Sequence, residues 1–144
     1  MQAFPHHYAV SAAATPGSTV TLTAADSPDL QSAAPVEFDG PGGHWSPETL
    51  LVAAVADCFV LSFVAVARAS RFEWSSLSCE VNGTLDRVDG KNRFTAFEVR
   101  PSLKLAQDSD RARAEKLLEK AETLCLITNS MLADTHLVPE ILSA

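Results

Sequence analysis

Basic residues are scarce in this chain of 144 residues, and no Lys or Arg occurs before Arg68. In total, 11 Lys and Arg stand against 18 Asp and Glu, which gives a formal net charge of −7. Proteins that bind nucleic acid or anionic membranes present a basic patch. The basic residues here are scattered and form no run, so we expect neither nucleic acid nor a membrane surface as a partner.

Cysteine is also scarce, with three in the chain, and no two of them form a CxxC motif. An odd count in a chain of this length does not indicate a disulfide scaffold. The four histidines and three cysteines show no spacing typical of a zinc site. We therefore expect no metal and no other cofactor.

The N-terminal stretch MQAFPHHYAV lacks the basic region and the continuous apolar segment of a signal peptide. A cytoplasmic, reducing location is the resulting expectation. Hydrophobic residues make up 47% and charged residues 20% of the chain, as is ordinary for a globular protein. The length fits a single domain over residues 1–144.

The most apolar stretch is SPETLLVAAVADCFVLSFVAVAR, residues 46–68. Ser46 as N-cap, Pro47 at the first helical position and Glu48 in the first turn predict the start of a helix. The helix is long enough to span a membrane, but Asp57 would lie mid-bilayer at a cost of about 2.5–3.5 kcal/mol. A central helix buried on nearly all sides, ending near Ser70, is the better prediction.

The rest of the chain alternates between strand and turn signals, with one further helix. We expect an α+β fold in which an antiparallel sheet packs on the central helix. A TPG turn separates the first two strands, and DGKN separates two longer strands of a hairpin. The expected strands are 6–12, 18–24, a short one at 36–38, 77–88, 93–105 and a closing strand from about 135, and the second helix is 108–124.

Cys58 lies in the middle of the apolar helix. Taken alone it is best interpreted as an inert, buried cysteine, because burial among aliphatic side chains raises a thiol pKa. A reactive Cys58 would need a cationic or hydrogen-bonding neighbour, and the adjacent Asp57 has the wrong charge.

The other two cysteines lie outside this helix. Cys125 stands where the second helix ends, in CLITNS, where packing at the helix end and partial exposure are both open. Cys79 lies in a strand with Leu77 and Val81 on the same face, which favours a role in packing. Cys58 and Cys125 together could form a peroxidatic and resolving pair, although their spacing alone does not bring them together.

Glu48 is by itself best interpreted as a solvated carboxylate at a helix start. On a straight helix it lies about 15 Å from Cys58, ten residues later. The two could share a site only through a kink or through a second subunit crossing the helix.

The segment GGHWSPETLLVAAVADCFVLSF, followed at a distance by CLITNSM, resembles the OsmC/Ohr family of thiol-dependent hydroperoxide reductases. The resemblance covers nearly the whole chain. It implies an OsmC-like α+β fold, with antiparallel sheets around a long central buried helix, in an intertwined homodimer whose active sites lie at the subunit interface. Such an interface would provide the second subunit that Glu48 and Cys58 need in order to share a site.

By this resemblance, Cys58 corresponds to the peroxidatic cysteine, Cys125 to the resolving cysteine and Glu48 to the acid that orients an arginine. The implied reaction reduces an organic hydroperoxide to its alcohol through a Cys58 sulfenic acid and a Cys58–Cys125 disulfide. A dithiol, such as a lipoyl group, or a small thiol would regenerate the enzyme, in keeping with an antioxidant stress response.

One departure concerns the family's N-terminal arginine, which lowers the thiol pKa and has no counterpart in residues 1–67. The groups left for this role are His6, His7 and His44, or Arg68 and Arg71 of a second copy of the chain. The alternative is an OsmC-like protein without peroxidase activity, which binds an apolar ligand or senses electrophiles at the dimer-interface pocket.

Overall fold

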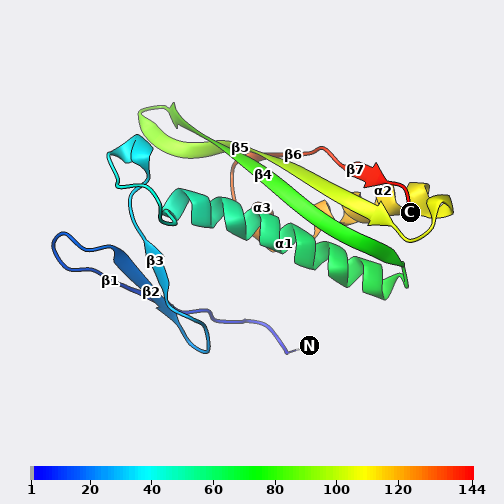
Figure 1. Cartoon of the computed structure of the whole chain (residues 1–144), viewed down its shortest axis with the longest axis horizontal. Helices are drawn as coiled ribbons and strands as arrows, with labels where there is room; N and C mark the ends of the chain where they lie inside the picture. The colour runs from blue at the N-terminus through cyan, green and yellow to red at the C-terminus, as the bar shows by residue number, and fades with distance from the viewer. Residues whose placement is uncertain (1) are drawn as a thin grey trace. The chain divides into compact units, whose positions relative to one another are not determined.

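The computed structural model describes residues 2–144, and the chain divides into two compact units, Met1–Leu50 and Leu51–Ala144 (Figure 1). The helices and strands follow one another along the chain in largely the expected order, so the α+β prediction is confirmed. The single domain over residues 1–144 stays a prediction.

The first unit contains a three-stranded antiparallel sheet in the order β1-β2-β3. The predicted turn between the first two strands is confirmed: the Ser18 N–H donates to the Thr15 carbonyl at 3.0 Å, and Gly17 supplies a positive φ of 78°. Its strands are β1 (Val10–Ala13), β2 (Val20–Ala24) and β3 (Leu30–Ser32).

The strand expected at 36–38 is wrong, because these residues form a single 3-10 turn, η1 (Val36–Phe38). Pro35 precedes the turn with its φ fixed at −72°, and Asp39 closes it in the left-handed region. The Asp39 N–H donates back to the Val36 carbonyl at 3.1 Å, so the backbone groups that a strand would need are already paired.

Helix α1 (Pro47–Ala69) begins as predicted. The Thr49 N–H donates to Ser46 Oγ at 3.2 Å, and the Ser46 N–H donates to Thr49 Oγ1 at 2.8 Å. This reciprocal pair satisfies backbone groups that have no partner within the helix.

The end of α1 is set by a Schellman motif with an arginine where glycine is usual. Arg71 has a φ of 51°, its N–H donates to the Arg68 carbonyl at 3.1 Å, and the Phe72 N–H donates to the Ala67 carbonyl at 2.9 Å. Phe72 is buried against the same core that α1 covers. The turn therefore directs the chain from α1 into the next strand.

The second unit contains a sheet centred on β5 (Lys91–Leu105). Strand β4 (Trp74–Val88) pairs with it antiparallel through the predicted hairpin. Asp89 and Gly90 form the two-residue turn with φ values of 51° and 76°, the geometry of a type I′ turn.

The closing strand differs from the expectation in two ways. It pairs with β5 in parallel, and Val138 and Pro139 divide it into β6 (Asp134–Leu137) and β7 (Glu140–Leu142). The purely antiparallel sheet was therefore wrong for this last segment. The intervening helices return the chain to the starting end of β5, which makes a parallel pairing the geometrically accessible one.

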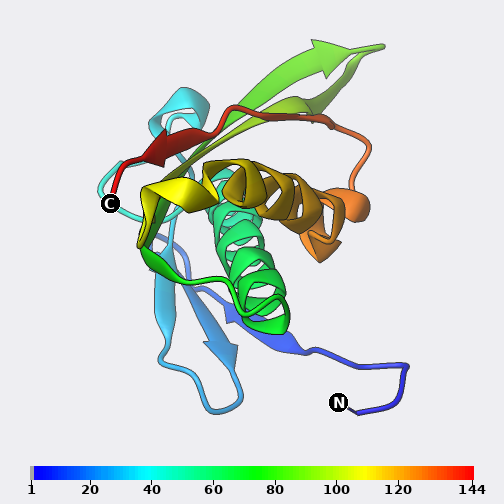
Figure 2. The same ribbon diagram turned by 90° about the vertical axis from the view of Figure 1, so that its right-hand side faces the viewer.

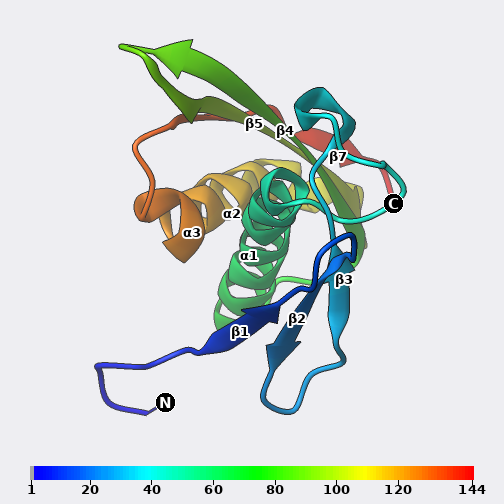
Figure 3. The ribbon, with the colours of Figure 1, turned by 90° about the vertical axis from the view of Figure 1, so that its left-hand side faces the viewer.

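The predicted second helix is confirmed as a 3-10 turn, η2 (Asp108–Asp110), that leads into α2 (Arg111–Thr123). A four-residue helix, α3 (Leu126–Asn129), follows the break at Leu124 and Cys125. Figures 2 and 3 show that α1, α2 and α3 cover the same face of the β4–β5 sheet.

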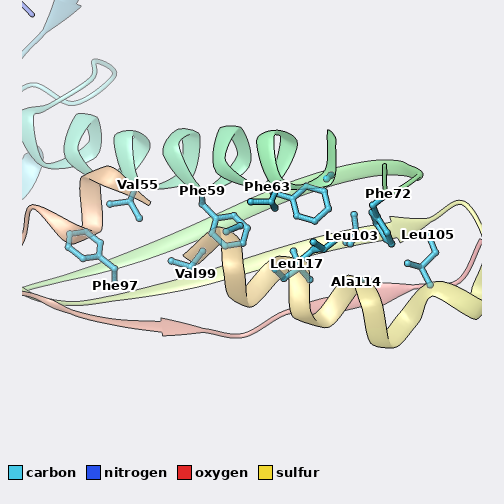
Figure 4. Close-up of a cluster of buried hydrophobic side chains, with 14 residues drawn as sticks. Val55, Phe59, Phe63, Phe72, Phe97, Val99, Leu103, Leu105, Ala114 and Leu117 are labelled. Carbon is cyan, nitrogen blue, oxygen red and sulfur yellow. The ribbon is translucent and has the colours of Figure 1, made fainter. Parts of the chain in front are cut away.

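The core of this unit lies between α1, α2 and β5, and Figure 4 shows side chains of these three elements converging. The alternating residues of β5 that face the helices are the buried ones, as expected for a strand with one face on the core. The largest fully buried apolar side chains include Phe59, Phe63, Phe97, Leu103, Leu105 and Leu118.

Within one chain α1 is buried along one face rather than on nearly all sides. Leu61 is 59% and Val64 38% exposed on its other face. The helix is long and apolar enough to cross a membrane, by length and composition alone. Its packing through Val55, Phe59 and Phe63 is that of a core helix with one apolar face left uncovered.

Candidate functional site

Cys58 is half-buried near the middle of α1, between the buried core residues Val55 and Phe59. Its sulfur lies beside the Cys125 thiol and the backbone N–H groups of Leu126 and Ile127. The structure thus brings together the two cysteines that the sequence could only suggest as a pair. They come from α1 and from the junction of α2 with α3.

The pKa of the Cys58 thiol is raised above its ordinary value, chiefly because burial disfavours the thiolate. Hydrogen bonding from the backbone N–H of Ile127 opposes this and lowers the pKa, with a smaller contribution from Leu126. The neighbouring Cys125 raises the pKa through its hydrogen bond and its charge. In a single chain, burial and Cys125 outweigh the two N–H groups.

Cys125 is almost fully buried, with 1% of its surface exposed. Its N–H donates to the Glu122 carbonyl at 3.1 Å, and its carbonyl accepts from the Asn129 N–H at 3.1 Å and from Thr128 Oγ1 at 3.2 Å. These bonds hold its backbone in an extended conformation between two helices. Of the two settings that the sequence left open, packing at the helix end is the one observed.

Cys79 lies in β4 on the face that packs against the core, as its alternation with Leu77 and Val81 predicted. Burial, followed by the charge of Cys125, raises the pKa of its thiol to about 11. All three cysteines of the chain are free, and Cys125 influences both of the others. No pattern in the sequence indicated that Cys125 acts on Cys79 as well as on Cys58.

Glu48 lies in the first turn of α1, ten residues before Cys58 on an uninterrupted helix, a rise of about 15 Å. Its Oε2 is buried without a hydrogen-bond partner among residues 2–144. Along this helix Glu48 and the thiol do not meet, so its role in orienting a cation stays a prediction.

Two of the candidate cations, Arg68 and Arg71, lie at the C-terminal end of α1. Arg68 is exposed in the last turn of α1, ten residues beyond Cys58, and Arg71 is exposed in the turn that follows. His6 stacks on Phe4 with 4.6 Å between ring centroids. Among the described residues, backbone N–H groups are the favourable partners that act on the Cys58 thiolate, and no cationic side chain does. The described residues also contain no cluster of His, Cys, Asp and Glu that could hold a metal ion.

Three leucine side chains in the segment that contains Cys125 are exposed. Leu126, directly after Cys125, is 73% exposed, and Leu124 and Leu132 are 48% and 91% exposed. Exposed apolar side chains in this segment suit a hydrophobic substrate or a second subunit.

Comparisons with known proteins give a consistent result. A sequence model described as OsmC-like protein matches residues 40–138. The uncharacterised protein YmaD of Bacillus subtilis is 32% identical over 106 residues, which is 72% of this chain and 71% of that protein.

Solved structures share the fold at lower identity. An OsmC-like protein of unknown function from Vibrio cholerae has a TM-score of 0.85 at 19% identity, covering 94% of this chain and 99% of the other. A structure from Legionella pneumophila, named as the organic hydroperoxide resistance protein OsmC, has a TM-score of 0.74 at 23% identity, covering 95% and 97%. With the family model matching well over half of its length, this chain belongs to the OsmC/Ohr family of OsmC-like proteins.

Proposed function

We propose that this protein is a cysteine-based peroxidase that reduces organic hydroperoxides to alcohols. The observation that carries the proposal is the convergence of Cys58 with Cys125 and with the N–H groups of Leu126 and Ile127. One thiol is half-buried and the other fully buried, which suits an attacking and a resolving cysteine. Family members named for organic hydroperoxide resistance support the substrate class.

In the proposed reaction the Cys58 thiolate attacks the outer peroxide oxygen, and the alcohol leaves after taking up a proton. Cys58 becomes a sulfenic acid. The Cys125 thiol then attacks the Cys58 sulfur, releasing water and forming the Cys58–Cys125 disulfide. Leu126 and Ile127 stabilise negative charge on Cys58 with their N–H groups. A dithiol of the lipoyl type, or a small thiol, reduces the disulfide in the cytoplasm.

The raised pKa of Cys58 means that a single chain is incompletely activated. We propose a homodimer in which a second copy covers the apolar face of α1 and brings its own charged groups toward Cys58. The exposure of Leu61 and Val64 supports this, as does the unpartnered oxygen of Glu48. A cation held by Glu48 at such an interface would lower the thiol pKa.

The test is consumption of cumene hydroperoxide in the presence of dihydrolipoamide. The wild-type protein should turn over, and Cys58→Ser should fall to the rate of the dithiol alone. Cys125→Ser should complete one turnover and then accumulate a Cys58 sulfenic acid, detected by mass spectrometry as its dimedone adduct. Equal turnover by wild type and Cys58→Ser would refute the peroxidase.

A second candidate function is favoured by the raised Cys58 pKa and by the exposed leucines near Cys125. In this alternative the protein binds an apolar ligand or senses electrophiles, without turning over peroxide. It predicts saturable binding of an apolar fluorophore and slow alkylation of Cys58 at neutral pH. Rapid alkylation of the assembled protein near pH 7 would count against it.

A further inference from the structure

The break between α2 and α3 carries both Cys125 and the backbone N–H groups that bond to Cys58. Helix α2 ends at Thr123, and α3 begins at Leu126. Cys125 lies between them with an extended backbone, at a φ of −66° and a ψ of 106°. A helix as short as α3 is held in its orientation by the hydrogen bonds and contacts that join it to its neighbours.

Asn129 is hydrogen-bonded on both sides of this break. Its side-chain Nδ2 donates to the Thr123 carbonyl at 3.0 Å, and its backbone N–H donates to the Cys125 carbonyl at 3.1 Å. The first bond satisfies one of the last carbonyls of α2, which have no partner within that helix. The second bond closes the single turn of α3. Asn129 therefore joins the end of α2 to α3.

The other side-chain hydrogen bonds from α3 and its C-cap stay within residues 125–130. Thr128 Oγ1 donates to the Cys125 carbonyl at 3.2 Å, and Ser130 Oγ donates to the Leu126 carbonyl at 2.8 Å. Both bonds tighten the turn of α3 itself. Among residues 2–144, Asn129 is the α3 residue whose side chain donates a hydrogen bond to α2.

The orientation of α3 matters because its first residues face Cys58. Ile127 packs against the buried cluster that contains Val55 and Phe59, which lie before and after Cys58 on α1. The backbone N–H groups of Ile127 and Leu126 hydrogen-bond to the Cys58 sulfur. Hydrogen bonds weaken steeply as their angle departs from linearity, so a modest rotation of α3 would weaken both.

We propose that Asn129 is a positioning residue for Cys58: its bond to α2 holds α3 where the N–H groups of Leu126 and Ile127 meet the thiolate. This inference rests on the proposed peroxidase function and deepens it by naming a residue that prepares the attacking thiol. Asn129 acts through the backbone of its neighbours. Because Cys125 lies in the same junction, one side chain helps to place both the N–H groups and the resolving thiol.

Removing this link should leave negative charge on Cys58 less well stabilised. The two N–H groups lower the Cys58 pKa, so weaker hydrogen bonds from them should raise it. A rise of about half a unit to one unit reduces the thiolate fraction at neutral pH by about threefold to tenfold. The thiolate is the form that reacts with an alkylating agent or a hydroperoxide. Cys125, the titratable group that acts on Cys58, is retained in every variant of this test.

The test is the rate at which iodoacetamide alkylates Cys58 at pH 7.5, read at the Cys58 peptide. Asn129→Leu, which keeps the size of the side chain, and Asn129→Ala should each react about threefold to tenfold more slowly than the wild-type protein. Their pH profiles should be displaced to higher pH. Labelling of the Cys79 peptide in the same samples should be unchanged, which shows that the core beneath β4 is intact.

Ser130→Ala is the matched control, because it removes a side-chain hydrogen bond to a carbonyl of the same short helix but not a link to α2. Its Cys58 should be alkylated at the wild-type rate. Slowing of the same size in Ser130→Ala, or wild-type rates in both Asn129 variants, would overturn the positioning role.

Alkylation uses no hydroperoxide, so this test is independent of the peroxidase assay. If the wild-type protein consumes no cumene hydroperoxide, the proposed function fails, and the alkylation rates of the Asn129 variants still decide the positioning role. If the wild-type protein turns over and both Asn129 variants are alkylated at its rate, the peroxidase stands and Asn129 has no part in preparing Cys58.

Discussion

At the scale of single residues, the reactivity of the Cys58 thiol depends on the groups that surround its sulfur. Cys58 has no cationic side chain acting on it among the described residues, and its stabilising partners are two backbone N–H groups at the start of α3. Cys125 opposes them through its hydrogen bond and its charge. Cys125 therefore restrains the reactivity of Cys58 while both thiols are reduced.

Replacing Cys125 should make Cys58 more reactive. Cys125→Ala removes a hydrogen bond and a charge that both raise the Cys58 pKa, so this pKa should fall. A lower pKa means a larger thiolate fraction at any pH below it, and hence faster alkylation at pH 7.5. The pH profile of iodoacetamide labelling, read at the Cys58 peptide, measures the shift.

The control for this experiment is Cys79→Ala, since Cys79 is not among the groups that act on Cys58. Its labelling profile at Cys58 should follow that of the wild-type protein. A Cys125→Ala profile shifted to higher pH would show that the contact between the two thiols does not raise the Cys58 pKa.

At the scale of elements, the residues at the two ends of α1 set its length and so the position of Cys58 within the helix. The cap formed by Ser46 and Thr49 fixes the start of the helix, and the left-handed Arg71 fixes its end. Arginine at this position adopts a positive φ that glycine adopts at no steric cost. At position 71, glycine should therefore stabilise the folded chain more than the native arginine does.

Arg71→Gly should raise the free energy of unfolding by about 0.5–1 kcal/mol, because it relieves the left-handed conformation. Urea denaturation followed by circular dichroism measures the change. Arg71→Ala is the matched control: it removes the same charge and side chain but keeps a Cβ, so it should give no such gain. A gain of the same size in Arg71→Ala would attribute the effect to charge rather than to backbone conformation.

The elements also show what the sequence could predict. The Ser46-Pro47-Glu48 start, the Asp89-Gly90 turn and the alternation around Cys79 are local signals, and each was confirmed. The parallel pairing of β6 and β7 depends on where α2 and α3 return the chain, which no local pattern states.

The candidate site likewise depends on contacts that no local sequence pattern predicts. The pairing of Cys58 with Cys125 was only one of the arrangements that their sequence positions allowed, and the fold was needed to bring the two thiols together. The charge of Cys125 also acts on the thiol of Cys79, which stands 46 residues earlier in the sequence. A single sequence contains no signal for such a long-range effect.

At the scale of the whole molecule, the uncovered face of α1 is the feature that the single chain leaves unexplained. A helix that is apolar on all sides is normally buried on all sides, yet Leu61 and Val64 are exposed here. A second copy of the chain packed on this face would bury them. It would also provide the charged groups that Cys58 lacks within Leu51–Ala144.

Leu61→Arg should therefore separate the proposed homodimer and reduce hydroperoxide turnover together. A buried, unpaired arginine at an apolar interface is strongly unfavourable, so the variant should elute at the mass of one 15.4 kDa chain where the wild-type protein elutes at twice that mass. Leu61→Met keeps the apolar contact and should remain dimeric and active. Multi-angle light scattering with the cumene hydroperoxide assay measures both properties. A monomeric wild-type protein, or a monomeric Leu61→Arg variant with full turnover, would show that one chain completes the active site alone.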